Sequence, residues 1–133
     1  MPRQRILFTI GCLWILAVPL APQSPKARPI VKPLQCPDRD CALLHGIPET
    51  AGMHSGFVRL MPGETVGWHS TGQNEEALVI LSGQGEVLVD GQPGQRFVAP
   101  ALAYIPPETR HNVRNAGKGL LEYAYVVAPA ARP

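Results

Sequence analysis

Three side chains of this sequence could together hold a metal ion. His69 and His111 carry imidazoles, and Glu76 carries a carboxylate. This donor set suits a divalent metal such as Fe, Mn, Zn, Ni or Cu, and three protein ligands leave coordination positions open. A metal there would polarise a carbonyl or hydroxyl group, or bind dioxygen. The sequence therefore predicts a divalent metal centre at these residues; a hydrogen-bonded polar plug without metal is the alternative.

The segments that must position these residues are short and are separated by turn signals. Asp90-Gly91 is a strong hairpin signal, and no stretch shows apolar residues at helical spacing. Turns that recur about every 8–12 residues indicate an antiparallel sandwich or barrel rather than an α/β fold. The predicted strands are residues 54–60, 65–70, 77–82, 86–90, 102–105, 111–114 and 120–127.

Alternation along the strands predicts which side chains point inward. Glu76 shares a strand face with Leu78 and Ile80, so its carboxylate is expected inside an apolar core. A buried carboxylate is costly unless it is paired or binds a metal. We expect His69 and His111 to meet Glu76 in this interior.

The order of these residues resembles that of the cupin family. The first cupin motif is matched by Gly63-x5-His69-x-Thr71-x4-Glu76-x6-Gly83, and the second by Pro106-x-Glu108-x2-His111-x3-Asn115. The resemblance covers about residues 54–127. It implies an all-β fold, an antiparallel double-sheet (jelly-roll) cupin barrel, and a homodimer.

The sequence departs from the cupin pattern at three positions. Thr71 replaces the second histidine of the first motif, which leaves the usual three-histidine, one-glutamate set incomplete. Gln73 or a water could fill that gap. Pro100 stands where the second motif begins with glycine. Glu108 replaces an internal glycine, which suggests a slightly different turn before His111.

Other polar and aromatic residues are weaker candidates. Trp68 is expected on the opposite side from His69, packed between sheets or at a dimer contact. Glu75 is expected in solvent, on the face opposite to Glu76. Surface or structural positions are expected for His45 and His54. Three tyrosines belong to the core, an interface or a pocket lining: Tyr104, Tyr123 and Tyr125.

The charge excludes nucleic acid as a partner. The formal net charge is +2, but without Arg3 and Arg5 the remaining 10 Lys and Arg balance the 10 Asp and Glu. No basic cluster exists to neutralise a row of phosphates. The sequence also lacks a nucleophile elbow, a P-loop and an H-E-x-x-H motif.

The N-terminal region predicts export. Residues 1–21 read as a signal peptide, with a basic start and an apolar run from Ile6 to Leu20, so the protein is expected to be periplasmic or secreted. Membrane attachment would follow only if this segment stays uncleaved. Residues 22–44 form a Pro-rich linker that leads into the barrel at 45–128, and residues 129–133 form a tail.

Cys36 and Cys41 form a C-x4-C pair just before the barrel. In an oxidising compartment a local disulfide is expected, with free thiols or a zinc site as the alternatives.

Two functions fit the whole pattern of the sequence. One is a metal-dependent oxygenase or isomerase acting on a small molecule in the barrel. The other is a non-catalytic small-ligand-binding or scaffold cupin without bound metal.

Overall fold

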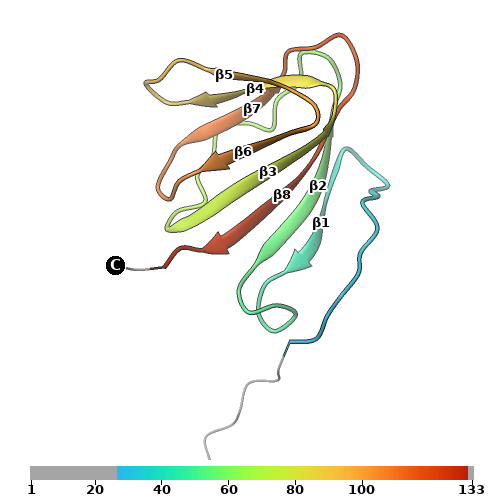
Figure 1. The fold of residues 1–133 in the computed structure, drawn as a ribbon, viewed down its shortest axis with the longest axis vertical. Helices are drawn as coiled ribbons and strands as arrows, with labels where there is room; N and C mark the ends of the chain where they lie inside the picture. The colour runs from blue at the N-terminus through green and yellow to red at the C-terminus, as the bar shows by residue number, and fades with distance from the viewer. Residues whose placement is uncertain (1–26, 132–133) are drawn as a thin grey trace, which may run out of the picture.

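The computed structural model describes residues 27–131, which form eight antiparallel strands and no helix (Figure 1). The predicted signal peptide lies outside the described residues. None of the described residues belongs to a helix that could span a membrane. The strands are β1 (Asp40–His45), β2 (His54–Leu60), β3 (Asn74–Ser82), β4 (Gln84–Val89), β5 (Gln95–Val98), β6 (Ala101–Ile105), β7 (His111–Asn115) and β8 (Leu121–Pro129).

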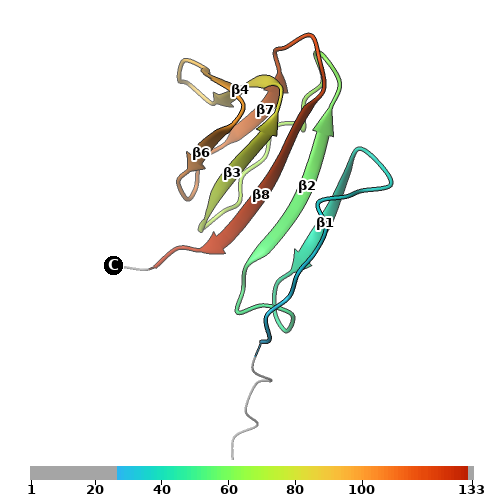
Figure 2. The same cartoon turned by 45° about the vertical axis from the view of Figure 1, so that its right-hand side comes forward.

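The strands form two sheets. The larger sheet has the order β1-β2-β8-β3-β6, and the smaller has the order β5-β4-β7. Figures 1 and 2 show the strands of the larger sheet side by side, with β4 and β7 above them beyond β6. The predicted all-β, double-sheet jelly roll is confirmed.

The core lies between the two sheets and follows the alternation of each strand. On β3, Glu76, Leu78 and Ile80 are buried, whereas Val79 and Leu81 point outward and are exposed. The inward side chains pack against those of β2, β7 and β8, and each large apolar one contributes about 1.5–3 kcal/mol through burial. Fully buried apolar members of this core are Leu60, Leu78, Ile80, Ile105, Val113 and Leu121.

The predicted strand at 65–70 is wrong. This segment makes only two isolated bridges to β7, Thr65 to Arg114 and His69 to His111. Between them Gly67 adopts a positive φ of 94°, a left-handed conformation that interrupts an extended chain. His69 therefore reaches the barrel from a connecting segment rather than from a regular strand.

Two strands were not predicted. β5 is a four-residue strand paired with β4, and β1 begins at Asp40, within the segment expected to be linker. Cys36 and Cys41 are joined by a disulfide, as the sequence indicates for an oxidising compartment. The Arg59 guanidinium donates hydrogen bonds to the carbonyls of Cys36 (2.8 Å) and Asp38 (2.6 Å). The segment before β1 is thus fastened to β2.

Candidate metal centre

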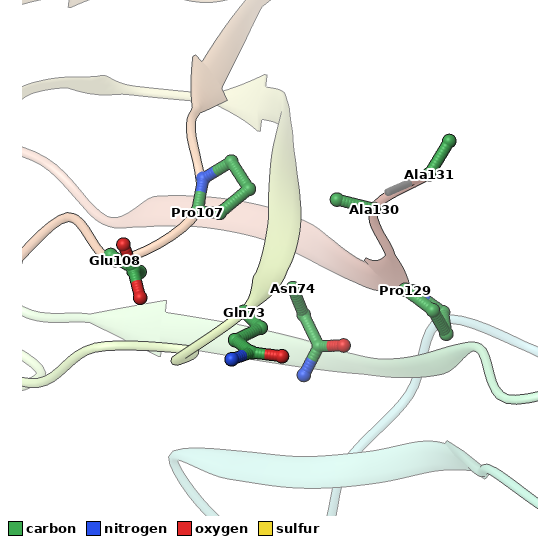
Figure 3. Close-up of a pocket in the computed structure, with 7 residues that line it drawn as sticks. All are labelled: Gln73, Asn74, Pro107, Glu108, Pro129, Ala130 and Ala131. Carbon is green, nitrogen blue, oxygen red and sulfur yellow. The ribbon is translucent and has the colours of Figure 1, made fainter. Parts of the chain in front are cut away.

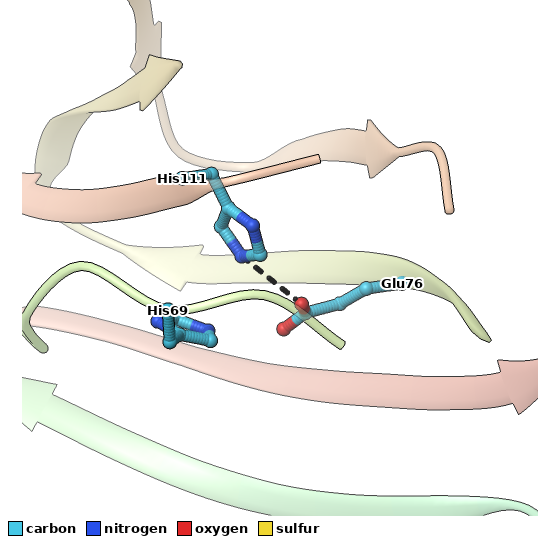
Figure 4. Close-up of side chains that lie close together, drawn as sticks. All are labelled: His69, Glu76 and His111. Carbon is cyan, nitrogen blue, oxygen red and sulfur yellow. Dashed lines mark ion pairs between the residues drawn. The ribbon is translucent and has the colours of Figure 1, made fainter. Parts of the chain in front are cut away.

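The structure brings the three predicted ligands together. Glu76 comes from β3 of the larger sheet, His111 from β7 of the smaller sheet, and His69 from the segment between β2 and β3. Their donor atoms all lie within 4.8 Å of one another. Figure 4 shows the two imidazoles and the carboxylate turned toward a common point.

Backbone pairing fixes the two histidines opposite each other. The His69 N–H donates to the His111 carbonyl (3.0 Å), and the His111 N–H donates to the His69 carbonyl (2.9 Å). The imidazole centroids are 4.3 Å apart, with the ring planes inclined by 57°. This reciprocal pair positions both rings before any metal binds.

Hydrogen bonds also set which ring nitrogen is available. Nδ1 of His69 lies 2.9 Å from the Gly67 carbonyl oxygen, and Nδ1 of His111 lies 3.0 Å from that of Thr109. A carbonyl oxygen only accepts, so Nδ1 carries the hydrogen in both rings. Nε2 of each neutral imidazole then presents a lone pair, which is the arrangement that metal-binding histidines adopt.

Glu76 and His111 leave two buried polar atoms without a partner. The His111 side chain is 0% exposed and that of Glu76 is 6% exposed, and Oε2 of Glu76 lies 3.1 Å from Nε2 of His111. Neither atom has a hydrogen-bond partner among the described residues. Buried polar atoms normally have one. A divalent cation would satisfy both atoms, so the donor set fits a metal.

The titration of His111 reflects the same contact. Burial by itself would lower the pKa of His111, but the side-chain contact with Glu76, the Thr109 carbonyl and the negative charge of Glu76 together raise it above its ordinary value. Without metal, a proton on Nε2 can take the place that a cation would hold beside the carboxylate.

His69 differs from its two partners in exposure. Glu76 and His111 are buried, whereas His69 is exposed, so the expectation that all three lie in the interior is wrong for His69. The reason is local, because Gly67 turns the chain out of a strand two residues earlier. The exposed imidazole gives the centre a side that solvent can reach.

A pocket of about 350 Å³ adjoins the centre. His69, Glu76 and Thr71 line one part of it, and Arg39 and Asp40 line another. The remaining lining is mostly apolar or aromatic: Cys41, Ala42, Val58, Val66, Val113, Tyr123, Tyr125 and Val127. A mostly apolar cavity with a few polar groups is typical of small-molecule sites.

Gln73, which was predicted as one way to fill the gap left by Thr71, does not line the pocket beside the centre. The Thr71 hydroxyl donates to the Asn74 carbonyl at 2.9 Å, so it is engaged by the backbone. Gln73 lines a different pocket of about 510 Å³ on the outside of the barrel (Figure 3). The residues lining that pocket are Gln73, Asn74, Pro107, Glu108, Pro129, Ala130 and Ala131.

Glu108, which stands where the second motif has a glycine, has a left-handed backbone conformation. Its φ is 58°, and its N–H donates to the Gly72 carbonyl at 2.6 Å. A glycine would take this conformation at less cost than a glutamate does.

Of the weaker candidates, Tyr123 and Tyr125 line the pocket and the others do not. Trp68 is 44% exposed and its ring lies 5.2 Å from the Arg110 guanidinium, so it does not pack between the sheets. Glu75 accepts a hydrogen bond from Tyr104 at 3.1 Å outside the pocket. His45 and His54 are exposed. Arg39 and Asp40 were not predicted as pocket residues, because they fall in the segment interpreted as linker.

Comparison with known proteins gives the family. The sequence profile of the cupin domain matches residues 56–127, a range that contains all three candidate ligands. This chain belongs to the cupin family. The match does not include β1 or the disulfide, which precede residue 56.

Two individual proteins are similar to this chain over part of their length. Protein SchB of Streptomyces halstedii is 32% identical over 87 residues, which is 63% of this chain and 62% of that protein. The cupin domain of Schizosaccharomyces pombe Cnp3 superposes with a TM-score of 0.61 at 21% identity, covering 68% of this chain and 64% of that one. The chain thus spans less than two thirds of both.

Two further solved structures have the same fold. A cupin 2 conserved barrel domain protein from Salinispora arenicola gives a TM-score of 0.59 at 23% identity and covers 81% of this chain and 92% of its own. A predicted oxalate decarboxylase from Thermotoga maritima gives a TM-score of 0.54 at 25% identity, and the superposition covers 58% of this chain and 66% of that one. These likenesses support the barrel.

Proposed function

We propose that this cupin binds a divalent metal ion through His69, Glu76 and His111, and a small molecule in the adjoining pocket. The observation that carries the proposal is the pair of buried atoms, Oε2 of Glu76 and Nε2 of His111, that face each other at 3.1 Å with no hydrogen bond to any other described residue. With the metal open toward the pocket, we propose metal-dependent oxygenase or isomerase chemistry on the bound molecule.

The residues of the chain have separate roles in this proposal. A divalent cation would supply Lewis acidity toward a carbonyl or hydroxyl oxygen. The carbonyls of Gly67 and Thr109 hold the two imidazoles in the required tautomer and orientation. The valines of the pocket exclude water from the bound molecule, which strengthens electrostatic interactions inside it.

A non-catalytic cupin without metal is the second candidate. The observation that favours it is Thr71, whose hydroxyl is engaged by the backbone, so the donor set stays at two histidines and one glutamate. In that case the proton on His111 replaces the cation, and the pocket holds a small ligand by shape and hydrogen bonds alone.

Metal analysis of protein purified without a histidine tag tests the proposal. We expect nearly one divalent metal per chain in the wild type, and a loss of most of it in His69→Ala. His45→Ala is the matched control, because it removes an exposed imidazole outside the centre. Folded protein that takes up no metal would refute the proposal. Oxygen uptake or turnover with small carbonyl and phenolic compounds then separates an enzyme from a binding protein.

We also propose export and self-association. The disulfide supports an oxidising compartment, in keeping with a signal peptide at residues 1–21. β6 is an edge strand on which Leu102 is 73% exposed and Tyr104 is 61% exposed. Exposed apolar side chains beside an unpaired edge support a homodimer formed through this strand.

A further inference from the structure

Gly56 allows Tyr125 to lie against the sheet. The two residues face each other in the β2–β8 pairing. A Cβ at position 56 would lie 2.4 Å from Cε1, Cζ and the hydroxyl oxygen of Tyr125, so the aromatic ring covers the Gly56 backbone. Any side chain at position 56 would therefore displace the ring. Because Tyr125 lines the pocket, the displacement would change the space available to a ligand.

The net charge of the pocket wall changes sign when a divalent metal binds. Glu76 and Asp40 are negative and Arg39 is positive, so the metal-free wall carries one net negative charge when both imidazoles are neutral. A divalent cation changes this to one net positive charge. A site with one net positive charge is matched best by a single negative charge on the ligand.

The tyrosines of the pocket do not oppose an anion. Burial raises the pKa of Tyr123, and burial likewise raises that of Tyr125, with the charge of Glu76 adding to both. Both hydroxyls therefore stay protonated and neutral at ordinary pH. They can donate hydrogen bonds to an oxygen of the ligand.

The size and lining of the pocket restrict the ligand further. A volume of about 350 Å³ is near the lower end of the ~300–1,000 Å³ found for ligand pockets. Val58, Val66, Val113 and Val127 offer an apolar surface for a carbon skeleton. The pocket thus suits a small molecule with an apolar body.

We infer that the metal-loaded pocket takes a small organic monoanion with an apolar body, and that Tyr125, held against Gly56, sets the length of that ligand. The inference rests on the metal binding proposed above. It assigns Tyr125 and Gly56 as the residues that determine ligand size, at the wall formed by β2 and β8 (Figure 2).

Calorimetric titration with salicylate, a monoanion, and with salicylamide, its uncharged analogue, tests the charge. At about pH 7 we expect the Zn²⁺-loaded protein to bind salicylate at least about tenfold more tightly than salicylamide, a difference of about 1.4 kcal/mol. Chelated protein should bind salicylate at least about tenfold more weakly than loaded protein. Equal affinity for the two probes, or equal binding with and without Zn²⁺, would overturn the inference.

Substitutions at the wall test the role of the ring. Gly56→Ala should weaken salicylate binding at least about tenfold while Zn²⁺ uptake is unchanged. The double variant Gly56→Ala/Tyr125→Ala should recover most of the lost salicylate affinity. Gly119→Ala is the matched control, because a Cβ there meets nothing within 4 Å and the backbone φ is not positive. An unchanged affinity in Gly56→Ala would refute the assignment.

A second variant covers the case in which Gly56→Ala does not fold. Tyr125→Ala removes the ring and lengthens the pocket, so the preference should shift at least about fivefold toward 3-hydroxy-2-naphthoate over salicylate. No shift would overturn the role of Tyr125. Loaded protein that binds Zn²⁺ but not salicylate refutes this inference and leaves the proposed function standing. A failure of Zn²⁺ uptake refutes both.

Discussion

The substitution Glu76→Gln should cost the metal-loaded protein far more stability than the metal-free protein. In metal-free protein the carboxylate is buried 3.1 Å from Nε2 of His111. Glutamine has the same shape, and its amide can donate to that nitrogen, a hydrogen bond worth about 1 kcal/mol. His111 can then remain neutral. Because neither buried group is then charged and both keep a hydrogen bond, we expect the free energy of unfolding to fall by less than about 1 kcal/mol, or to rise.

In the presence of Zn²⁺ the difference in stability between the wild type and Glu76→Gln should be larger. Zn²⁺ at a concentration about 100 times its dissociation constant should add about 2.7 kcal/mol to the stability of the wild type. In a domain of this size that corresponds to a rise in Tm of about 10–20 °C. If losing the carboxylate weakens binding about a hundredfold, the same zinc concentration should add only about 0.4 kcal/mol to Glu76→Gln.

Thermal and urea unfolding of both proteins, with chelator and with Zn²⁺, measure these effects. Glu75→Gln is the matched control, because the neighbouring carboxylate only accepts a hydrogen bond from Tyr104 outside the pocket. It should leave the zinc-dependent rise intact. A loss of about 3 kcal/mol or more in metal-free Glu76→Gln would show that Glu76 stabilises the fold as an ion pair. An equal zinc effect in wild type and Glu76→Gln would refute the donor set.

Three further outcomes are expected. Glu108→Gly should raise the free energy of unfolding by up to about 1 kcal/mol in urea, because glycine takes the positive φ of this position without strain; a fall would contradict that reading. Cys36→Ser/Cys41→Ser should lower the free energy of unfolding by about 2 kcal/mol and leave Zn²⁺ uptake unchanged, because the disulfide only stabilises the fold. Loss of Zn²⁺ uptake would contradict this purely structural role. Leu102→Asp on β6 should convert a dimer to a monomer in light scattering, whereas an unchanged mass would exclude this strand as the interface.

The sequence predicts the part of the structure that depends on local pattern. Alternation places Glu76 with Leu78 and Ile80, and the structure buries all three on the inner face of β3. The spacing of the two cupin motifs predicts which donors meet, and His69, Glu76 and His111 do lie together. These features follow from strand periodicity and from a motif order shared with the family.

Features that depend on backbone conformation or on distant contacts were not predicted. The exposure of His69 depends on the left-handed conformation of Gly67. The sequence of residues 65–70 does not reveal that conformation. β1 lacks a clear apolar alternation. It is an edge strand, and what defines it is backbone pairing to β2, which the sequence does not show. Nothing in the sequence of β2 shows that the glycine at position 56 lies beneath a tyrosine of β8.

The pocket is lined by two parts of the chain, the segment before β2 that contains the disulfide and the barrel itself. The metal donors and the valines belong to the barrel that cupins share, within residues 56–127. Arg39, Asp40 and Ala42 lie outside that range and line the same pocket. The chain outside the cupin match therefore contributes to the pocket without supplying any of the three candidate donors, so a substitution at Arg39, Asp40 or Ala42 would alter the shape or charge of the pocket while leaving the donor set intact.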